Sequence, residues 1–484
     1  MPDAAGRGGP AVGLKERVYA HTPPVLQSAL LSAYGLLWRQ RRLGGAFHRY
    51  VAEYAARDFL SAAEWQAYQG DRLAALLRHA LQAVPAYRRL PMRADALHLL
   101  EGNRPFEALR LFPLLDKEAL RRAPHDFVAS QPGGRLGAAL TSGTTGTPLR
   151  IMASADTHRR FMAAYEARVR RWAGVGYGDR RVMIGGRLIV PAQDRRGPFW
   201  RTNWAEHQLY MSAFHIGPDT ALRYAAAIVR FAPRYLVGYA SALWALADEL
   251  ERQGWRTPQP LAAVLTSSEP LRPDMRATLS RVWGCRVYDG YSGVESCCLA
   301  GECGHGRLHL NPDVGVVEFL ENAGDPPQGT EPCEMVATGL LNLDQPLIRY
   351  RTGDMAVPSA APCGCGRSMP VIEELVGRVE DDVILRDGTR VRRFHSLPLG
   401  LADVRSVQVV QESPDEFVLN VVADGALSEP SRRALVSRLQ ERCGAVRVEV
   451  CTVPEQERTR HGKFRAVVNR SGVAAGGWAH TPSE

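Results

Sequence analysis

The chain has 484 residues, 45% of them hydrophobic, which is too long for one ordinary domain and too apolar for a disordered chain. Its 45 glycines follow no triplet repeat, which excludes collagen, and its 9 cysteines are too few for a disulfide scaffold of this length. No apolar run approaches the roughly 20 residues of a spanning helix, which excludes a polytopic membrane protein. The net charge is +9, but the arginines are scattered without interleaved aromatic residues, so we expect no nucleic-acid partner.

An apolar stretch from Val25 to Trp38 follows a few basic residues near the N-terminus. It is a poor signal peptide, because polar residues interrupt it and residues 39–42 (RQRR) follow in place of a cleavage site with small side chains. Two interpretations stay open: an amphipathic helix packed on its own domain, and a helix in contact with a membrane surface. We expect no transmembrane segment.

Residues 20–125 are predicted to be a helical lead-in, because apolar residues recur there at three- and four-residue spacing. Between residues 134 and 375, helix-like stretches alternate with short runs that favour strands, which is typical of an α/β domain. The predicted helices of this region are 157–171 and 220–231, and its predicted strands are 181–184, 235–237, 262–266, 286–288 and 314–320.

The pattern changes around Gly377. We expect a large N-terminal domain of mixed sheets and helices over residues 1–379, and a small α+β C-terminal domain over residues 380–484. In the small domain the predicted strands are 383–385, 406–411, 416–422 and 446–453, with a charged helix at 430–442.

Residues 141–148 read TSGTTGTP after a short run that favours a strand. Two glycines and five hydroxyl residues in its first seven positions make a loop rich in N–H and O–H donors, which can wrap around phosphate oxygens. It is not a Walker A loop, because no Gly-Lys-Ser/Thr ends it. The candidate phosphate-binding residues are Thr141, Ser142, Gly143, Thr144, Thr145 and Gly146.

A cluster of cysteines is the second sharp signal, since seven of the nine lie within residues 285–365. Cys363 and Cys365 are expected to lie in one tight turn, and Cys303 lies six residues before His309. These four residues are therefore candidate ligands of a structural zinc ion. Buried free thiols are the alternative. The clustering and the odd number favour a reducing compartment, so we expect a cytoplasmic protein. The competing ligands are His305, Cys297, Cys298 and Cys333.

Four segments, in order, resemble the signatures of the adenylate-forming (acyl-AMP ligase) superfamily, beginning with residues 141–148. Residues 347–354 (LIRYRTGD) resemble the segment whose aspartate, here Asp354, binds the ribose of ATP. Residues 377–381 (GRVED) resemble the hinge segment, here with Arg378 and the hinge residue Glu380, and residues 462–465 (GKFR) resemble the segment of the catalytic lysine, here Lys463. The spacing is similar to that of the phenylacetate–CoA ligase-like branch, which implies a mobile C-terminal domain beside an AMP-binding adenylation domain.

One segment departs from the family. Residues 291–295 read YSGVE where the family usually reads Y-G-x-T-E. The resemblance implies that Glu295 contacts Mg²⁺ and that Tyr291 lies against adenine, but Val294 has no hydroxyl for the α-phosphate. Ser292 and Ser296 are the candidates to replace that hydroxyl.

Residues 267–270 (SSEP) resemble the segment that lines the adenine and acyl pockets, which assigns Ser268 and Glu269 to ATP binding. The expected acyl-substrate pocket has a polar and aromatic lining, which favours an aryl or small polar acid. Its residues are Tyr239, Ser241, Ser267 and Gly293.

Lysine is rare in this chain, in which Lys15, Lys117 and Lys463 are the only lysines beside many arginines. Activating a carboxylate at the α-phosphate of ATP calls for a divalent cation, loop donors and a cationic side chain aimed at the growing charge. Lys463 fits the last role, and a surface lysine is the alternative. With Glu295 and Arg378 it makes up the expected catalytic set.

The resemblance implies an enzyme that uses ATP and Mg²⁺ to form acyl-AMP and then passes the acyl group to a nucleophile, by default coenzyme A. In some relatives the acceptor is an amine or a carrier-protein thiol, or nitrite is activated, in natural-product or polysaccharide biosynthesis. A nucleotide-binding module without activity is the alternative of another class. The presence of Glu295, Asp354, Arg378 and Lys463 disfavours that module. The acid, the acceptor and the oligomeric state stay open.

Overall fold

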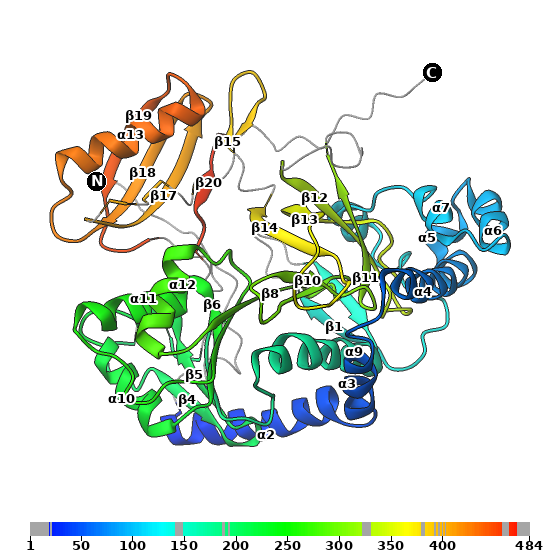
Figure 1. Cartoon of the computed structure of the whole chain (residues 1–484), viewed down its shortest axis with the longest axis horizontal. Coiled ribbons are helices and arrows are strands. Elements are labelled where there is room, and N and C mark those ends of the chain that lie inside the picture. The colour runs from blue at the N-terminus through cyan, green and yellow to red at the C-terminus, as the bar shows by residue number, and fades with distance from the viewer. Residues whose placement is uncertain are drawn as a thin grey trace, which may run out of the picture.

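The computed structural model describes residue 19 and residues 22–140, 149–185, 189–191, 194–321, 331–378, 383–391, 394, 397–398, 400–401, 403–456 and 464–471. Within them a twelve-stranded sheet forms the centre of the molecule, and a four-stranded sheet lies apart from it at the upper left of Figure 1. The α/β class predicted from the alternating pattern is therefore confirmed.

The predicted helical lead-in is confirmed. Its longest helix begins with a capping box, in which the Ser61 hydroxyl accepts from the Glu64 N–H and the Glu64 carboxylate accepts from the Ser61 N–H. The leucines at three- and four-residue spacing on the same helix are buried, as the periodicity requires. The helices are α2 (Pro24–Leu43), α3 (Phe47–Ala56), α4 (Ala62–Ala83), α5 (Pro85–Arg88), α6 (Arg93–Glu101), α7 (Pro105–Arg110) and α8 (Lys117–Arg122).

The large sheet is parallel in one half and antiparallel in the other. Its strand order is β11-β12-β13-β14-β10-β9-β8-β7-β6-β3-β5-β4. The parallel strands are β3 (Arg181–Gly185), β5 (Gln208–Ser212), β6 (Tyr235–Tyr239), β7 (Ala263–Ser267) and β8 (Val287–Ser292). The others are β4 (Trp200–Asn203), β9 (Leu299–Glu302), β10 (Leu308–Leu310), β11 (Gly315–Leu320), β12 (Cys333–Gly339), β13 (Tyr350–Ser359) and β14 (Val371–Arg378).

Crossover helices connect the parallel strands and cover the sheet, which buries the strands as expected for βαβ units. All five strands and both helices predicted for residues 134–375 are present. The structure also contains strands that the sequence did not predict, among them the short β4, β5, β9 and β10 and the longer β12, β13 and β14. A hairpin of β1 (Gly137–Leu140) and β2 (Arg150–Ala153) lies outside the large sheet. The helices are α9 (Ala155–Tyr165), continued by η1 (Glu166–Arg170) and η2 (Arg171–Ala173), then η3 (Trp204–Glu206), η4 (Ala213–His215), α10 (Ala221–Phe231), α11 (Ala240–Arg252) and α12 (Pro273–Trp283).

The four-stranded sheet has its own hydrophobic core, in which Phe417, Leu419, Leu435 and Leu439 are buried. This core supports our proposal that residues 380–484 are a separate small domain, whose expected hinge residue, Glu380, lies outside the described residues. The order is β19 (Arg447–Thr452), β18 (Glu416–Ala423), β17 (Val404–Ser413) and β20 (Val467–Asn469), with α13 (Glu429–Cys443) and a hairpin of β15 (Val383–Ile384) and β16 (Arg390–Val391) beside it.

A buried arginine joins the helical lead-in to the sheet. Arg168 in η1 has no exposed side-chain area. Its guanidinium donates to the carboxylates of Asp58 at 3.0 Å and Asp313 at 2.5 Å, to the Asn311 side chain at 3.0 Å and to the Tyr54 carbonyl at 2.8 Å. A buried cation needs such partners because desolvation of an unpaired charge is very costly.

We expect Arg168→Ala to lower the free energy of unfolding by about 3–5 kcal/mol, because it leaves the carboxylates of Asp58 and Asp313 buried with less positive charge. Chemical denaturation followed by tryptophan fluorescence measures this. Arg49→Ala is the matched control, because Arg49 forms an exposed pair with Glu53 and its loss should cost less than about 0.5 kcal/mol. Equal losses in the two variants would contradict the assignment.

Candidate active site

The carboxyl ends of three parallel strands bring predicted acyl-pocket residues together. Tyr239 at the end of β6 is directly opposite Ser267 at the end of β7, and Ser267 is opposite Gly290 of β8. Ligands of open α/β sheets bind beyond the carboxyl ends of such strands. Ser241 lies at the start of α11, directly after β6, and Gly293 lies directly after β8. All four predicted pocket residues therefore lie at the same edge of the sheet.

The turn after β8 presents Glu295. The Ser296 N–H donates to the Gly293 carbonyl at 3.1 Å, and Ser296 has a φ of +54°. A Cβ on Gly293 would lie 2.7 Å from the Glu295 Oε2 atom, so a side chain at this position would displace the Glu295 carboxylate. The Ser296 hydroxyl donates to the carbonyl of Val294 at 3.4 Å and so stabilises the turn itself.

A tyrosine that the sequence did not assign holds Glu295 in place. The fully buried Tyr350, at the start of β13, donates its hydroxyl to the Glu295 Oε1 atom at 3.1 Å. Burial and the carboxylate raise the pKa of Tyr350, so it stays a donor. Tyr350 lies within the LIRYRTGD segment, but nothing in the sequence links it to a residue 55 positions earlier.

Asp354 links two other predicted site residues. Its Oδ2 atom accepts from the Tyr291 hydroxyl at 2.7 Å, and its Oδ1 atom lies 3.2 Å from the Arg378 Nε atom. Asp354 and Arg378 are directly opposite on β13 and β14, so strand pairing fixes the contact. A carboxylate has about four lone-pair sites, so Asp354 keeps the capacity to accept from two vicinal hydroxyls. Burial raises the pKa of Tyr291 well above its usual value.

Glu269 lies between the start of a helix and the C-terminal segment. Its Oε2 atom accepts from the Ser241 N–H, in the first turn of α11, at 2.9 Å, and its Oε1 atom accepts from the Phe464 N–H at 2.9 Å. A carboxylate is favourable at a helix N-terminus because the first N–H groups have no partner within the helix. Ser268 beside it has a φ of +71°, a strained conformation for a serine.

A buried carboxyl group lies beneath these strand ends. Asp289 of β8 accepts from the Thr266 hydroxyl at 2.8 Å and from the Gly290 N–H at 2.9 Å. Burial raises the pKa of Asp289 to about 7. Neighbouring Glu302 pairs with Arg276 at 2.8 Å. The floor of the site is therefore a network of polar groups rather than an apolar layer.

Three sets of predicted site residues lie outside the described residues: the phosphate loop Thr141, Ser142, Gly143, Thr144, Thr145 and Gly146, the hinge residue Glu380, and Lys463. The strands on either side of the loop are described. The Met152 N–H of β2 donates to the Gln345 side chain at 2.6 Å, and the Asn342 side chain donates to the Met152 carbonyl at 2.9 Å. Both partners lie in the turn before β13, and no motif in the sequence pointed to them.

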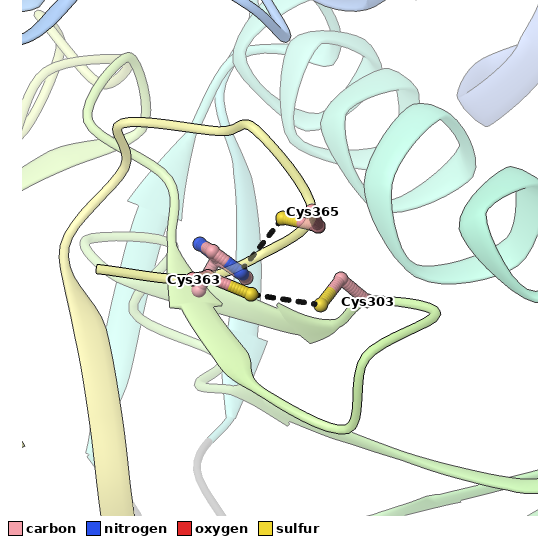
Figure 2. A group of neighbouring side chains, drawn as sticks. Cys303, Cys363 and Cys365 are labelled. Carbon is pink, nitrogen blue, oxygen red and sulfur yellow. Dashed lines mark hydrogen bonds between the residues drawn. The ribbon is translucent and has the colours of Figure 1, made fainter. Parts of the chain in front are cut away.

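Three cysteines converge in Figure 2, and the ligand atoms of Cys303, His309, Cys363 and Cys365 all lie within 4.8 Å of one another. The Cys303 and Cys363 sulfurs are 3.7 Å apart, and the Cys365 sulfur is 3.5 Å from the His309 Nε2 atom. A tetrahedral zinc ion with Zn–S of about 2.3 Å and Zn–N of about 2.0 Å has ligand–ligand edges of about 3.8 and 3.5 Å, so this cluster fits zinc. The His309 Nδ1 atom lies 3.3 Å from the Met369 carbonyl, which aims Nε2 at the sulfurs.

The structure discriminates between the competing ligands. The ring of His309 belongs to the cluster. His305 contributes its backbone N–H, which donates to the Cys303 sulfur at 3.4 Å. Cys297 and Cys298 pack in a hydrophobic core instead. Cys363 and Cys365 lie in the connection between β13 and β14, the strands that carry Asp354 and Arg378, so the cluster stabilises the far end of the hairpin that forms the site.

Comparisons with known proteins agree with this geometry. The family described as the CapK C-terminal domain matches residues 392–470. Protein CapK of Staphylococcus aureus is 24% identical over 411 residues, which cover 84% of this chain and 88% of that protein. A phenylacetate-coenzyme A ligase of Escherichia coli (strain K12) is 28% identical over 67% of this chain and 73% of its own length. The resemblance to the adenylate-forming superfamily and to its phenylacetate–CoA ligase-like branch is therefore confirmed by relatives of similar sequence.

Solved structures agree on the fold of this adenylate-forming ligase. A 2-hydroxyisobutyryl-CoA ligase in its postadenylation state matches with a TM-score of 0.66 at 20% identity, over 85% of this chain and 91% of that one. The same ligase in its thioesterification state matches over the same share of this chain with a TM-score of 0.54. The enzyme is thus similar in fold to acid–CoA ligases, including their separate C-terminal domain.

Proposed function

We propose that this ligase activates an organic carboxylate with ATP and transfers the acyl group to coenzyme A. The observation that carries the proposal is the convergence of Glu295, Tyr291, Asp354 and Arg378 through the contacts of Tyr350 and Asp354. Tyr350 holds Glu295, and Asp354 contacts both Tyr291 and Arg378; a non-catalytic nucleotide-binding module would have no need to keep both sets of contacts.

Each group has a chemical role in this proposal. A carboxylate oxygen of the acid attacks the α-phosphorus of ATP, and the bond to pyrophosphate breaks. The thiolate of coenzyme A then attacks the acyl carbon, and AMP leaves. Glu295, held by Tyr350, offers the oxygen ligand that Mg²⁺ prefers, and Mg²⁺ supplies charge neutralisation at the phosphates. Asp354 accepts from the ribose hydroxyls, and Ser292 takes the place of the hydroxyl missing at Val294.

The position of the C-terminal segment supports an adenylating arrangement of the two domains. Phe464, which follows Lys463 in the sequence, donates its N–H to Glu269 at the edge of the site. Arg405 of β17 contacts Glu249 of α11 at 3.0 Å, which joins the small domain to this helix of the large domain. Arg405 also contacts Asp424, which follows β18, at 2.7 Å. The higher TM-score against the postadenylation state agrees with this arrangement.

The lining at the strand ends favours an aryl or small polar acid. Tyr239 supplies an aromatic face, and Ser241 and Ser267 supply polar groups at the same edge. Isotope exchange between pyrophosphate and ATP, measured with aryl, fatty and amino acids in turn, identifies the acid. Mass spectrometry after addition of coenzyme A, an amine or a carrier protein then identifies the acceptor. Tight ATP binding without exchange for any acid would contradict the proposal.

Lys463→Ala should separate the two half-reactions. We expect acyl-AMP formation to fall by about 10²-fold or more, because one cation at the transition-state charge is lost. Thioester formation from supplied acyl-AMP should fall far less, and Lys463→Arg should not restore adenylation, because a planar guanidinium does not replace a compact ammonium. Lys15→Ala is the control. Asp354→Ala should instead raise the KM for ATP, because the ribose is bound in the ground state and the transition state alike. Wild-type pyrophosphate release by Lys463→Ala would refute the assignment.

We also propose that the Cys303–His309–Cys363–Cys365 cluster binds one structural zinc ion. The two measured ligand–ligand distances match the edges of a zinc tetrahedron, and Cys303 and His309 have no exposed area. The ion would join the connection between β13 and β14 to the strands β9 and β10, and it would take no part in the chemistry.

Protein purified without chelators should carry about one zinc ion per chain by elemental analysis. Cys365→Ser should lose the ion and lower the thermal midpoint, because the binding energy of a structural metal is folding energy. Cys451→Ser is the control, since Cys451 lies outside the cluster among the described residues. Metal-free wild-type protein, or equal metal content in the two variants, would contradict the site.

A further inference from the structure

Helix α2 packs on the protein with a face on which polar and small residues surround Leu31. The Ser28 hydroxyl accepts from the Thr202 N–H of the edge strand β4 at 3.3 Å, and the Ser32 hydroxyl accepts from the N–H of Trp204, directly after β4, at 3.0 Å. Gly35 continues this face, where a Cβ would lie 2.6 Å from the Asn203 side chain. Residues 28, 32 and 35 share one side of a helix, so the contact fixes which side faces away from the protein.

The side that faces away is apolar, which reverses the usual arrangement of a surface helix. Its large side chains are between 51% and 72% exposed. Trp204 on the adjoining η3 is 56% exposed and extends the same region. Contiguous exposed apolar patches are rare on monomeric soluble proteins and mark interaction sites. The side chains concerned are Val25, Leu26, Leu30, Tyr34, Leu36 and Leu37.

The charges on this helix have one sign. Residues 24–43 contain no aspartate or glutamate, and Arg39 and Arg41 near the C-terminal end are exposed. Arg42 pairs with the buried Glu206 of the protein itself. Burial, with a further contribution from Arg42 and Arg41, lowers the pKa of His158 to about 4.

Two candidate partners are poor fits. Among the helices of the described chain, none is long and apolar enough to cross a bilayer, so α2 does not span one. A second copy docked on the same face would present another helix without carboxylates, so Arg39 and Arg41 would find no opposite charge on it. Lipid phosphates would supply that charge, and acyl chains would cover the leucines.

We propose that α2 and Trp204 form a docking surface for an anionic lipid bilayer. The helix lies along the bottom of the molecule in Figure 1, away from the small sheet at the upper left. Its leucines enter the boundary between headgroups and acyl chains, with Trp204 and Tyr34 at that level and the arginines on the headgroups. Because the small sheet lies on the other side, the two domains keep their freedom to move when the enzyme is bound.

Co-sedimentation of the full chain with vesicles tests the proposal. Vesicles of phosphatidylcholine and phosphatidylglycerol should bind the protein, and phosphatidylcholine alone or high salt should weaken binding. Leu30→Glu and Leu37→Glu should each lower the partition coefficient at least about tenfold, because each removes a leucine from the bilayer and adds a negative charge. Leu111→Glu is the matched control, because Leu111 is 38% exposed at the end of α7, far from α2 in Figure 1.

Unchanged thermal midpoints of Leu30→Glu and Leu37→Glu would show that the folded state is intact, as expected for substitutions at exposed positions. Three results would overturn the proposal: no sedimentation of the wild type with anionic vesicles, equal binding by Leu37→Glu and the wild type, or a wild-type dimer in light scattering that Leu37→Glu splits. The last result would assign the face to a second copy. None of these results depends on the acid or the acceptor of the ligase.

Discussion

The charge of Arg168 is the constraint that the arrangement of the molecule depends on. Its guanidinium has no exposed area, so folding requires carboxylates from two distant parts of the chain to meet it, Asp58 after α3 and Asp313 between β10 and β11. Asp58 also accepts from the Trp172 ring N–H at 2.7 Å and from Arg367 at 3.3 Å. Arg367 follows the turn of Cys363 and Cys365, so one cluster of charges places the helical lead-in, the antiparallel half of the sheet and this turn together.

The change from parallel to antiparallel pairing at β8 builds the site from this framework. The parallel strands before β8 bring their carboxyl ends, and with them the residues predicted for the acyl pocket, to one edge of the sheet. The antiparallel strands after it return long stretches of chain to the same edge, which places Asp354 opposite Arg378 and Tyr350 against Glu295. Asp354 and Arg378 of the proposed nucleotide site therefore come from the antiparallel half of the sheet, whereas the proposed acyl-pocket residues follow its parallel strands.

Much of this fold could be predicted from the sequence, because buried strands and amphipathic helices have strong local periodicity. The strands ending at Tyr239 and Ser267 and the helix α13 are examples. Strands of the antiparallel half such as the short β10 and the longer β13 could not, because pairing with neighbours rather than local composition determines them. The roles of Tyr350 and Glu269 depend on contacts between residues far apart in the chain, and such contacts leave no local pattern.

The hydroxyls of Ser28 and Ser32 have a consequence beyond the position of α2. The strand β4 ends the twelve-stranded sheet, and an unpaired sheet end is a template for the addition of a foreign strand. The two serines accept from the N–H groups of Thr202 and Trp204 that such a strand would need. Helix α2 therefore acts as a cap against amyloid-like growth from this end, and its removal by truncation would expose an aggregation-prone edge.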